Sequence, residues 1–437
     1  MKRISSRFLV IHVIVAFLAI VSACQQPSGT APTANNTGRS TADPKSPGDP
    51  ISIGLLEPQT GALSSWGLAK IAGMKYAVQV VNDSGGIKSL GGARLNAVIG
   101  DSASDAAKAT AEAERLISSA GVVAIAGPVS TMEVLGVIPV TEKYHVPVIS
   151  STGDRSQFGK GYQYLFSQMT MEMGASVAKF VDWLAKNHGA PTAKIGIGAA
   201  NNVAYIGDEV AQTLKQMGYQ NVMDPFTFAQ GTTDQTALVE KLKAANVTLV
   251  VYWGTTNDTA AFMKASYAGD YYPWFLSNGT AFGVNALRDS IDPKIAQKTL
   301  ARPNAFAIGV GYFNDAYWNI PGSKAFLDGF LKANPDTKVD LGLAETGAQS
   351  VFSIARAIEN AASRKPEDIA AALRKLNMKA PDPYLVDAFN HPEIQMLESG
   401  MSTNSKVFGA QWSDDLSSLQ AFYPPDSAGA NKPRIQR

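Results

Sequence analysis

The sequence is poor in the residues that reactive and metal-binding sites use, because its 437 residues include one cysteine and four histidines. A single cysteine excludes a disulfide within one chain. The three histidines that follow it, His145, His188 and His391, lie too far apart for metal-ligand spacing. The G-x-S-x-G, Walker A and H-E-x-x-H motifs are missing as well. We therefore expect neither an enzyme nor a bound metal or cofactor.

The chain also lacks an excess of charge of either sign, with 38 basic and 37 acidic residues and a net charge of +1. Residues 1–23 hold three basic residues. The rest of the chain has 35 basic and 37 acidic residues, which gives a net charge of −2. No cluster of lysine and arginine of the kind that binds nucleic acid occurs, so nucleic acid is not an expected partner. Beyond residue 23 no apolar run is long enough to span a membrane.

The first residues have the pattern of a secretory signal peptide. Lys2, Arg3 and Arg7 precede an apolar run over 8–20, and small residues then lead to Cys24. An uncleaved membrane anchor is the alternative. The stretch Val-Ser-Ala-Cys resembles the bacterial lipobox, and this resemblance implies cleavage before Cys24 and attachment of lipid to its sulfur. We expect Cys24 to hold the protein at a membrane, since its Ser/Pro/Gly-rich surroundings offer nothing to activate a thiol.

Residues 24–50 are rich in Pro, Gly, Ser and Asn and are expected to be a flexible linker. The 387 residues that follow are too many for one core, which predicts two domains. Short apolar strands alternate with helical segments over 51–170 and again over 172–305, and this rhythm predicts parallel sheets covered by helices. The fold class is therefore α/β, with two doubly wound lobes. The stretch KVFGAQWSDDLSSLQAFYPP predicts a β-hairpin near the end.

The first predicted helix, GLAKIAGMKYAVQVVND, has apolar residues spaced by three or four. These are Leu68, Ile71, Met74, Val78 and Val81.

Ligands of open α/β sheets bind beyond the carboxyl ends of the strands, so polar and aromatic residues at those points are the candidates. In the first lobe, Trp66 either covers an apolar part of a ligand or packs on its own lobe. Ser130 and Glu133 fit a capping box at the start of a helix. Either this motif only caps the helix, or the helix start, including Thr131, also binds a carboxylate or amide oxygen of a ligand. Asp154 follows the next strand and either takes a ligand's donors or caps a helix.

In the second lobe the strand ends carry three further candidates, Tyr205, Trp253 and Asn278. Aromatic and amide groups at these positions repeat the kind of residue found at the strand ends of the first lobe. The aromatic run YYPWF over 271–275 favours core packing instead.

The sequence resembles the branched-chain amino acid and amide-type periplasmic binding proteins of ABC importers. The resemblance runs from about 51 to 425 and is densest in IGLLEPQTGALSSWGLAKIAGMKYAVQVVNDSGGI, GDSASDAAKATAEAERLI, VVAIAGPVS and HVPVISSTG. It implies a type I periplasmic-binding fold of two lobes joined by a three-strand hinge. The implied lobes are 51–170 with 306–395, and 171–305 with 396–437. A small ligand would bind in the cleft between the lobes of an extracytoplasmic monomer, which would deliver it to an ABC permease.

The resemblance also assigns roles to residues. Trp66 corresponds to an aromatic lid, while Ser130 or Thr131, together with Gly153 and Asp154, fall on loops that hold the ligand's carboxylate and amino group. Tyr205 and Trp253 fall on the face of the second lobe.

One departure from the family bears on the ligand. Amino-acid binders place an acid after the strand that matches WFLSNG, but this chain has Asn278-Gly279-Thr280 there. Either another acid, Asp154 or less favourably Glu345, replaces it, or the ligand lacks an ammonium group. An aromatic carboxylate, urea or a short amide would then fit.

Two functions thus remain open at the level of sequence. The first is solute capture for an ABC importer by a lipid-anchored receptor, with an amino acid-like, amide or aromatic-acid solute. The second is a sensory or envelope-assembly receptor that uses the same fold without transport, because fold alone does not fix function.

Overall fold

The computed structural model describes residues 48–150, 157–158, 160–168, 173–283, 285–309, 321–379, 381–386, 393–402, 408–423, 425 and 432–435. The predicted signal peptide, Cys24, most of the predicted linker, Gly153 and Asp154 lie outside the described residues.

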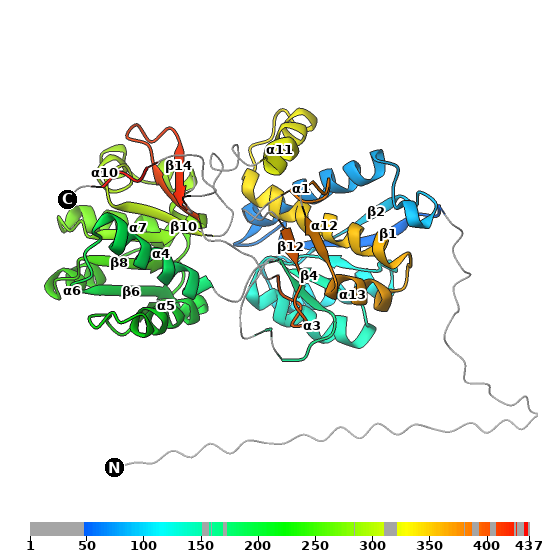
Figure 1. Ribbon diagram of the computed structural model, residues 1–437, viewed down its shortest axis with the longest axis horizontal. Coiled ribbons are helices and arrows are strands. Elements are labelled where there is room, and N and C mark those ends of the chain that lie inside the picture. The colour runs from blue at the N-terminus through cyan, green and yellow to red at the C-terminus, as the bar shows by residue number, and fades with distance from the viewer. Residues whose placement is uncertain are drawn as a thin grey trace, which may run out of the picture. The chain divides into compact units, whose positions relative to one another are not determined.

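Five parallel strands form the first sheet, in the order β2-β1-β3-β4-β5. Of these, β1, β2 and β4 are labelled in Figure 1. Their bounds are β1 Ile51–Glu57, β2 Leu95–Asp101, β3 Ile125–Ala126, β4 Val148–Ser150 and β5 Leu165–Ser167. The order reverses direction between β1 and β3, because β2 lies on one side of β1 and the later strands on the other. Such a reversal creates the point at which open α/β sheets receive ligands.

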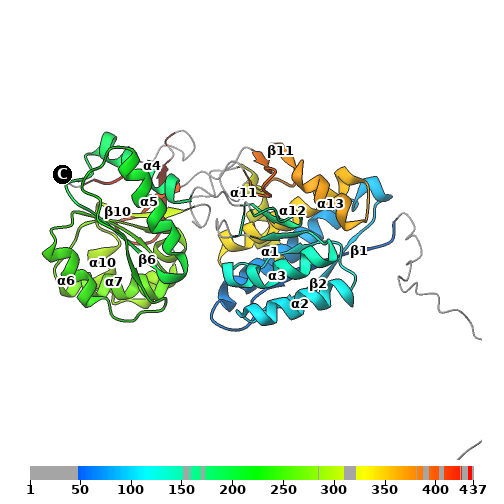
Figure 2. The same ribbon diagram turned by 90° about the horizontal axis from the view of Figure 1, so that it is seen from below.

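Helices cover both faces of this sheet, and β1 alternates its side chains between them. Leu55 is buried in the cluster that includes Met74 of α1 and Ile354 of α12, whereas Leu56 faces Leu116 of α2 and Val137 of α3. Figure 2 shows α2 and α3 next to each other. The bounds are α1 Ser64–Asp83, α2 Ala106–Ser118, α3 Thr131–Tyr144 and α12 Leu341–Ala361.

The remaining first-lobe elements are one short helix between α1 and β2 and four elements from the later part of the chain. They are η1 Lys88–Leu90, α11 Pro321–Ala333, α13 Pro366–Arg374, β11 Asn377–Lys379 and β12 Glu393–Gln395. The last two pair as an antiparallel ribbon.

The second sheet has seven strands in the order β14-β13-β10-β9-β8-β6-β7. Its parallel part, β7-β6-β8-β9-β10, repeats the order of the first sheet, and β13 and β14 add an antiparallel hairpin, as the sequence predicted. The bounds are β6 Ile195–Ala200, β7 Phe226–Phe228, β8 Leu249–Trp253, β9 Trp274–Asn278, β10 Ala305–Gly309, β13 Phe408–Trp412 and β14 Leu419–Tyr423.

The central strands of the second sheet, β6, β8 and β10, are buried on both faces. Val251 of β8 packs with Val177 of α4 and Val210 of α5, while Tyr252 points to the opposite face and contacts Phe262 of α7. The helices are α4 Met173–His188, η2 Asn201–Val203, α5 Ala204–Gln216, α6 Thr236–Ala244, α7 Thr256–Ala268, α8 Gly279–Phe282, α9 Asn285–Ser290 and α10 Pro293–Thr299.

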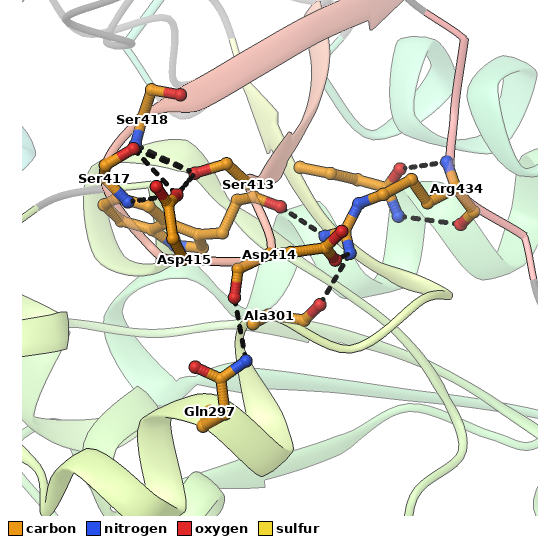
Figure 3. A network of polar contacts seen from close by, with 10 residues as sticks. Gln297, Ala301, Ser413, Asp414, Asp415, Ser417, Ser418 and Arg434 are labelled. Atoms are coloured by element: carbon orange, nitrogen blue, oxygen red, sulfur yellow. Dashed lines mark hydrogen bonds and ion pairs between the residues drawn. The ribbon is translucent and has the colours of Figure 1, made fainter.

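Hydrogen bonds fix the C-terminal segment 432–435 to the second lobe (Figure 3). The guanidinium of Arg434 donates to the carbonyl of Ala301 at 2.8 Å and pairs with Asp414. The main-chain N–H of Arg434 donates to the side-chain oxygen of Gln411 at 2.7 Å. Gln297 of α10 completes the network by donating to the carbonyl of Asp414 at 2.8 Å.

The two parallel-sheet lobes confirm the predicted α/β class. The chain passes from the first sheet to the second after β5, since β6 to β10 all lie in the second sheet. The predicted lobe boundary at 305/306 falls inside β10, which pairs with β9 and β13. Residues 396–402 stay beside the first sheet, where Met401 bridges to Ser167. Within the described part of the chain, no helix is long and apolar enough to cross a membrane.

Candidate ligand-binding site

The reversal of strand order occurs at equivalent places in the two sheets, between β1 and β3 and between β6 and β8. The strand on the far side of each reversal, β3 or β8, leads directly into a helix, α3 or α7. The first N–H groups of a helix have no partner within that helix, so its start favours a carboxylate or amide oxygen. Each lobe therefore presents a helix start at its switch point.

The start of α3 is fixed by the capping box that the sequence predicted. The hydroxyl of Ser130 accepts from the N–H of Glu133 at 3.3 Å and donates to the Glu133 carboxylate at 2.6 Å. That carboxylate also accepts from the N–H of Ser130 at 3.3 Å and from the hydroxyl of Ser102 at 2.5 Å. Because the hydroxyl proton of Ser130 is already donated to Glu133, the groups of this turn that are placed to meet a ligand are the first amides, beginning with Thr131.

The start of α7 has the same construction. Thr255 caps the helix, its hydroxyl donating to Asp258 at 2.7 Å and its N–H donating to the same carboxylate at 2.9 Å. Asp258 is fully buried. The capping boxes Ser130–Glu133 and Thr255–Asp258 thus occupy topologically equivalent positions in the two lobes.

The loop after β1 holds Trp66 in the first turns of α1. Trp66 is partly buried and packs against the buried residues Ala69 of α1 and Leu343 of α12, so its ring lies on its own lobe with part of its surface exposed. Asp101 at the end of β2 fixes this loop by accepting from the N–H of Gln59 at 2.8 Å. Slight burial would raise the pKa of Asp101, but hydrogen bonds from this loop and from Ala103 lower it.

The candidate residues of the second lobe differ in how much of their side chains is exposed to solvent. Tyr205, in the first turn of α5, is partly exposed. Trp253 is only 8% exposed and packs in the cluster beneath α4 and α5. Asn278 is buried, and its side-chain amide donates to the carbonyl of Gly254 at 2.9 Å and accepts from the N–H of Gly254 at 3.3 Å. Asn278 therefore joins the ends of β8 and β9, beside the start of α7.

The sequence reading missed a buried ion pair under the first switch point. Glu57 is the last residue of β1 and Lys70 lies in α1, both are fully buried, and Lys70 Nζ lies 3.7 Å from Glu57 Oε1. Burial raises the pKa of Glu57 to about 8, with Lys70 opposing and Glu133 adding to the rise. Burial also lowers the pKa of Lys70. A lysine between Ala69 and Ile71 on the apolar side of the helix was the available signal, since lysine is almost never fully buried without a partner.

The candidate residues of each lobe lie on the switch-point side of its sheet. In the first lobe these are Trp66, Ser130 and Thr131, and in the second lobe they are Tyr205, Trp253 and Asn278. These edges offer helix starts, hydroxyls and aromatic surface, which suit binding of a small polar or amphipathic molecule. In the described residues, no group of three or more His, Cys, Asp or Glu is placed to hold a metal ion.

The comparisons identify the class of protein. The chain belongs to the periplasmic binding protein family, whose model matches residues 50–415. It is thus a member of a family of solute-binding proteins that work outside the cytoplasm, and this family is not one of enzymes.

One relative and two solved structures are similar to most of this chain. The Leu/Ile/Val-binding protein homolog 8 of Brucella abortus is 25% identical over 388 residues, which cover 86% of this chain and 91% of the relative. The branched-chain amino acid transporter substrate-binding protein LivJ of Streptococcus pneumoniae, solved with isoleucine, has a TM-score of 0.68 at 19% identity, covering 86% of this chain and 100% of that one. A solute-binding protein of an ABC transporter from R. palustris, solved with 4-hydroxybenzoate, has a TM-score of 0.66 at 19% identity, covering 85% and 95%. These two likenesses show the type I periplasmic-binding fold.

Proposed function

We propose that this chain is the solute-binding lipoprotein of an ABC importer, tethered through lipid on Cys24. It would capture a small amino acid-like, amide or aromatic-acid solute with the switch-point edges of its two lobes. Ligand contacts to both lobes would stabilise a closed arrangement, which a permease would recognise.

One observation carries this proposal. The strand order 2-1-3-4-5 occurs twice, and each time a capped helix starts at the switch point, through Ser130–Glu133 in one lobe and Thr255–Asp258 in the other. A catalytic site needs reactive groups held in one geometry, whereas these two edges supply helix N–H groups that suit polar recognition.

The proposed class of solute is based on what relatives are named for binding and on the residue at the end of β9 in the second lobe. Relatives are named for binding leucine, isoleucine and valine, and one fold neighbour was solved with an aromatic acid. At the end of β9, where amino-acid binders carry an acid, Asn278 is engaged with Gly254. Amino acids and aromatic acids both carry the carboxylate that a helix start favours, and the presence or absence of an ammonium group separates them.

A thermal-shift screen tests solute capture. The panel holds branched-chain amino acids, short amides, urea and aromatic acids such as 4-hydroxybenzoate. A ligand at one hundred times its Kd adds about 2.7 kcal/mol to the free energy of unfolding, which corresponds to a rise in Tm of roughly 3 °C for a chain of this size. A folded protein with no shift for any member at millimolar concentration would refute the proposal.

Three variants test the candidate ligand-binding residues and the lipid tether. Trp66→Ala should weaken the binding of the solute that the screen identifies, measured by calorimetry, without lowering the Tm of the ligand-free protein by more than a few degrees. Asp154→Ala should do the same if Asp154 receives an ammonium group, and should leave an aromatic acid unaffected. Cys24→Ala should move the protein from the membrane fraction to the soluble extracytoplasmic fraction, and continued sedimentation with membranes would contradict lipidation.

A further inference from the structure

The start of α1 is capped differently from the starts of α3 and α7. In α3 and α7 the third helical residue, Glu133 or Asp258, accepts the N–H of the residue that precedes the helix. In α1 the third helical residue is Trp66, whose ring offers no acceptor, and the residue before the helix, Leu63, makes no side-chain cap of its own. An acceptor for the N–H of Leu63 must therefore come from another part of the chain.

Ser104, in the loop between β2 and α2, supplies this acceptor. Its hydroxyl oxygen accepts the N–H of Leu63 at 2.9 Å, and the hydroxyl donates to the carbonyl of Thr60 at 2.9 Å. The carbonyl of Leu63 in turn accepts the N–H groups of Trp66 and Gly67, each at 3.0 Å. A continuous series of hydrogen bonds therefore connects Ser104 to Trp66.

The backbone around Ser104 is held in a conformation that needs support. Ala103 and Ser104 both have left-handed φ angles, 54° and 59°, which cost free energy in residues other than glycine. The carboxylate of Asp101 accepts from the N–H of Ala103 at 2.8 Å and from the hydroxyl of Thr60 at 2.9 Å. The contacts that fix this strained turn are thus shared with the loop that leads into α1.

The two loops also approach each other at main-chain distance. A Cβ atom at Gly61 would lie 2.5 Å from the carbonyl oxygen of Ala103. A Cβ atom at Gly67 would lie 1.9 Å from the carbonyl oxygen of Pro58, so the first turn of α1 rests directly on the loop that precedes it. Movement of this loop therefore moves the turn that carries Trp66.

We propose that Ser104 is a positioning residue for ligand binding, which caps α1 from the neighbouring loop and so holds Trp66 at the switch point of the first lobe. This inference rests on the proposed function, in which Trp66 contacts the solute. Because an aromatic side chain occupies the third helical position of α1, Ser104 takes the part that a carboxylate at that position plays in α3 and α7. Without the hydroxyl, the ring would be held only by its packing on Ala69 and Leu343.

Hydrogen exchange tests the cap. Ser104→Ala removes the hydroxyl and should speed exchange of the Trp66 and Gly67 amides by roughly fivefold, the effect of losing a cap. Ser104→Gly should do the same, although glycine relieves the left-handed backbone. Ser104→Asn should restore slow exchange, because asparagine tolerates this conformation and its side-chain oxygen can accept the N–H of Leu63.

The glycine variant separates the hydroxyl from the backbone strain. If S104G exchanged as slowly as the unmodified chain while S104A exchanged quickly, strain alone would explain the effect and the proposal would fail. Unchanged exchange in both variants, or exchange in S104N as fast as in S104A, would overturn it too. Should S104A fail to fold, fast exchange in S104G with slow exchange in S104N supports the proposal, and equal rates in the two refute it.

A matched control and a local probe show whether the effect is confined to Trp66. Ser118 of α2 also donates its hydroxyl to a main-chain carbonyl, that of Glu114 at 2.6 Å, and S118A should leave exchange of the Trp66 and Gly67 amides unchanged. The chain has six tryptophans. In protein labelled with fluorotryptophan, S104A should shift the fluorine resonance of Trp66, assigned from W66F, and leave the other five in place. A shift of all the resonances, or faster exchange in S118A, would show a general loosening and overturn the proposal.

A double-mutant cycle connects Ser104 to binding through Trp66. L-leucine and 4-hydroxybenzoate are the probes, and whichever stabilises the unmodified protein should bind S104A more weakly by roughly threefold or more. In a W66A background, the Ser104→Ala change should have no further effect on the Kd. An equal loss of affinity in both backgrounds, or no loss in either, would overturn the proposal. If neither probe binds the unmodified protein, the proposed function loses support, whereas hydrogen exchange and the fluorine spectrum still decide whether Ser104 positions Trp66.

Discussion

The contact between α1 and α12 allows a sharp test of the first lobe, the substitution Gly73→Ala. A Cβ atom at Gly73 would lie 1.7 Å from the carbonyl oxygen of Ala344, far inside any normal contact. The approach is close from both sides, because a Cβ atom at Gly347 would lie 2.5 Å from the carbonyl oxygen of Lys70. A main-chain carbonyl within a helix cannot rotate away, so the two helices must separate to admit the methyl group.

The expected change in the free energy of unfolding of Gly73→Ala is the difference between two opposing contributions. Overpacking of a core costs typically 1–3 kcal/mol, and we take about 3 kcal/mol because the obstacle is main chain. Replacing glycine by alanine inside a helix returns about 1 kcal/mol. The net loss of about 2 kcal/mol corresponds to a fall of roughly 4–8 °C in the Tm of a unit of about 200 residues.

Differential scanning calorimetry measures this fall, and Gly207→Ala is the matched control. Gly207 also lies inside a helix, but a Cβ atom there would have its nearest neighbours at 3.5 Å, an ordinary contact. The control should therefore be neutral or up to about 1 kcal/mol more stable. If G73A melted within a degree of the unmodified protein, the close approach of α1 and α12 would be disproved.

Two further predictions concern the second lobe. Asn278→Ala removes both hydrogen bonds to the main chain of Gly254 and should lower the free energy of unfolding by about 2–4 kcal/mol, and an unchanged urea midpoint would contradict a structural role. Hydrogen bonds from Ser413 and Ser417 lower the pKa of Asp415 to about 2. Since this is below the value of an unfolded chain, its contribution to stability is present above about pH 4 and is lost as the pH falls through 2. The difference in stability between the unmodified protein and D415N should therefore shrink between pH 5 and pH 2, and a constant difference would contradict it.

Local patterns explain why much of the fold could be predicted. Apolar runs bounded by glycine gave the strands, and spacing by three or four gave α1, in which Ile71, Met74, Val78 and Val81 are buried. Leu68, in the same predicted stripe, is 48% exposed although its neighbours Gly67 and Ala69 are buried, so this position of α1 faces solvent. The capping box of α3 was also predictable, since its two residues are three positions apart and the interaction is local.

The site was less predictable because its contacts join distant parts of the chain. Trp66 packs against Leu343, and no local pattern indicates which residue of α12 reaches α1. The same limit applies to Asn278, whose partner Gly254 lies on a neighbouring strand. Sequence shows which side chains follow a strand, whereas strand order and register decide what they contact.

The equivalent helix starts of the two lobes are supported by different chemistry. In the second lobe, the residue equivalent to Glu57 by its place at the strand end is Ala200, which carries no charge. There the hydroxyl of Tyr252 donates to the carbonyl of Asp258 at 3.1 Å and accepts from Gln235 at 3.0 Å, all inside the core. Burial raises the pKa of Tyr252, which favours the neutral hydroxyl that makes this contact.

Both helix starts are capped by a buried carboxylate, Glu133 in α3 and Asp258 in α7, and the first lobe adds the buried pair Glu57–Lys70 at the end of β1. Burial raises the pKa of Glu57, Lys70 opposes that rise, and Glu133 adds to it. A substitution that changes the charge near the start of α3 is therefore expected to act on this pair as well as on the capping carboxylate.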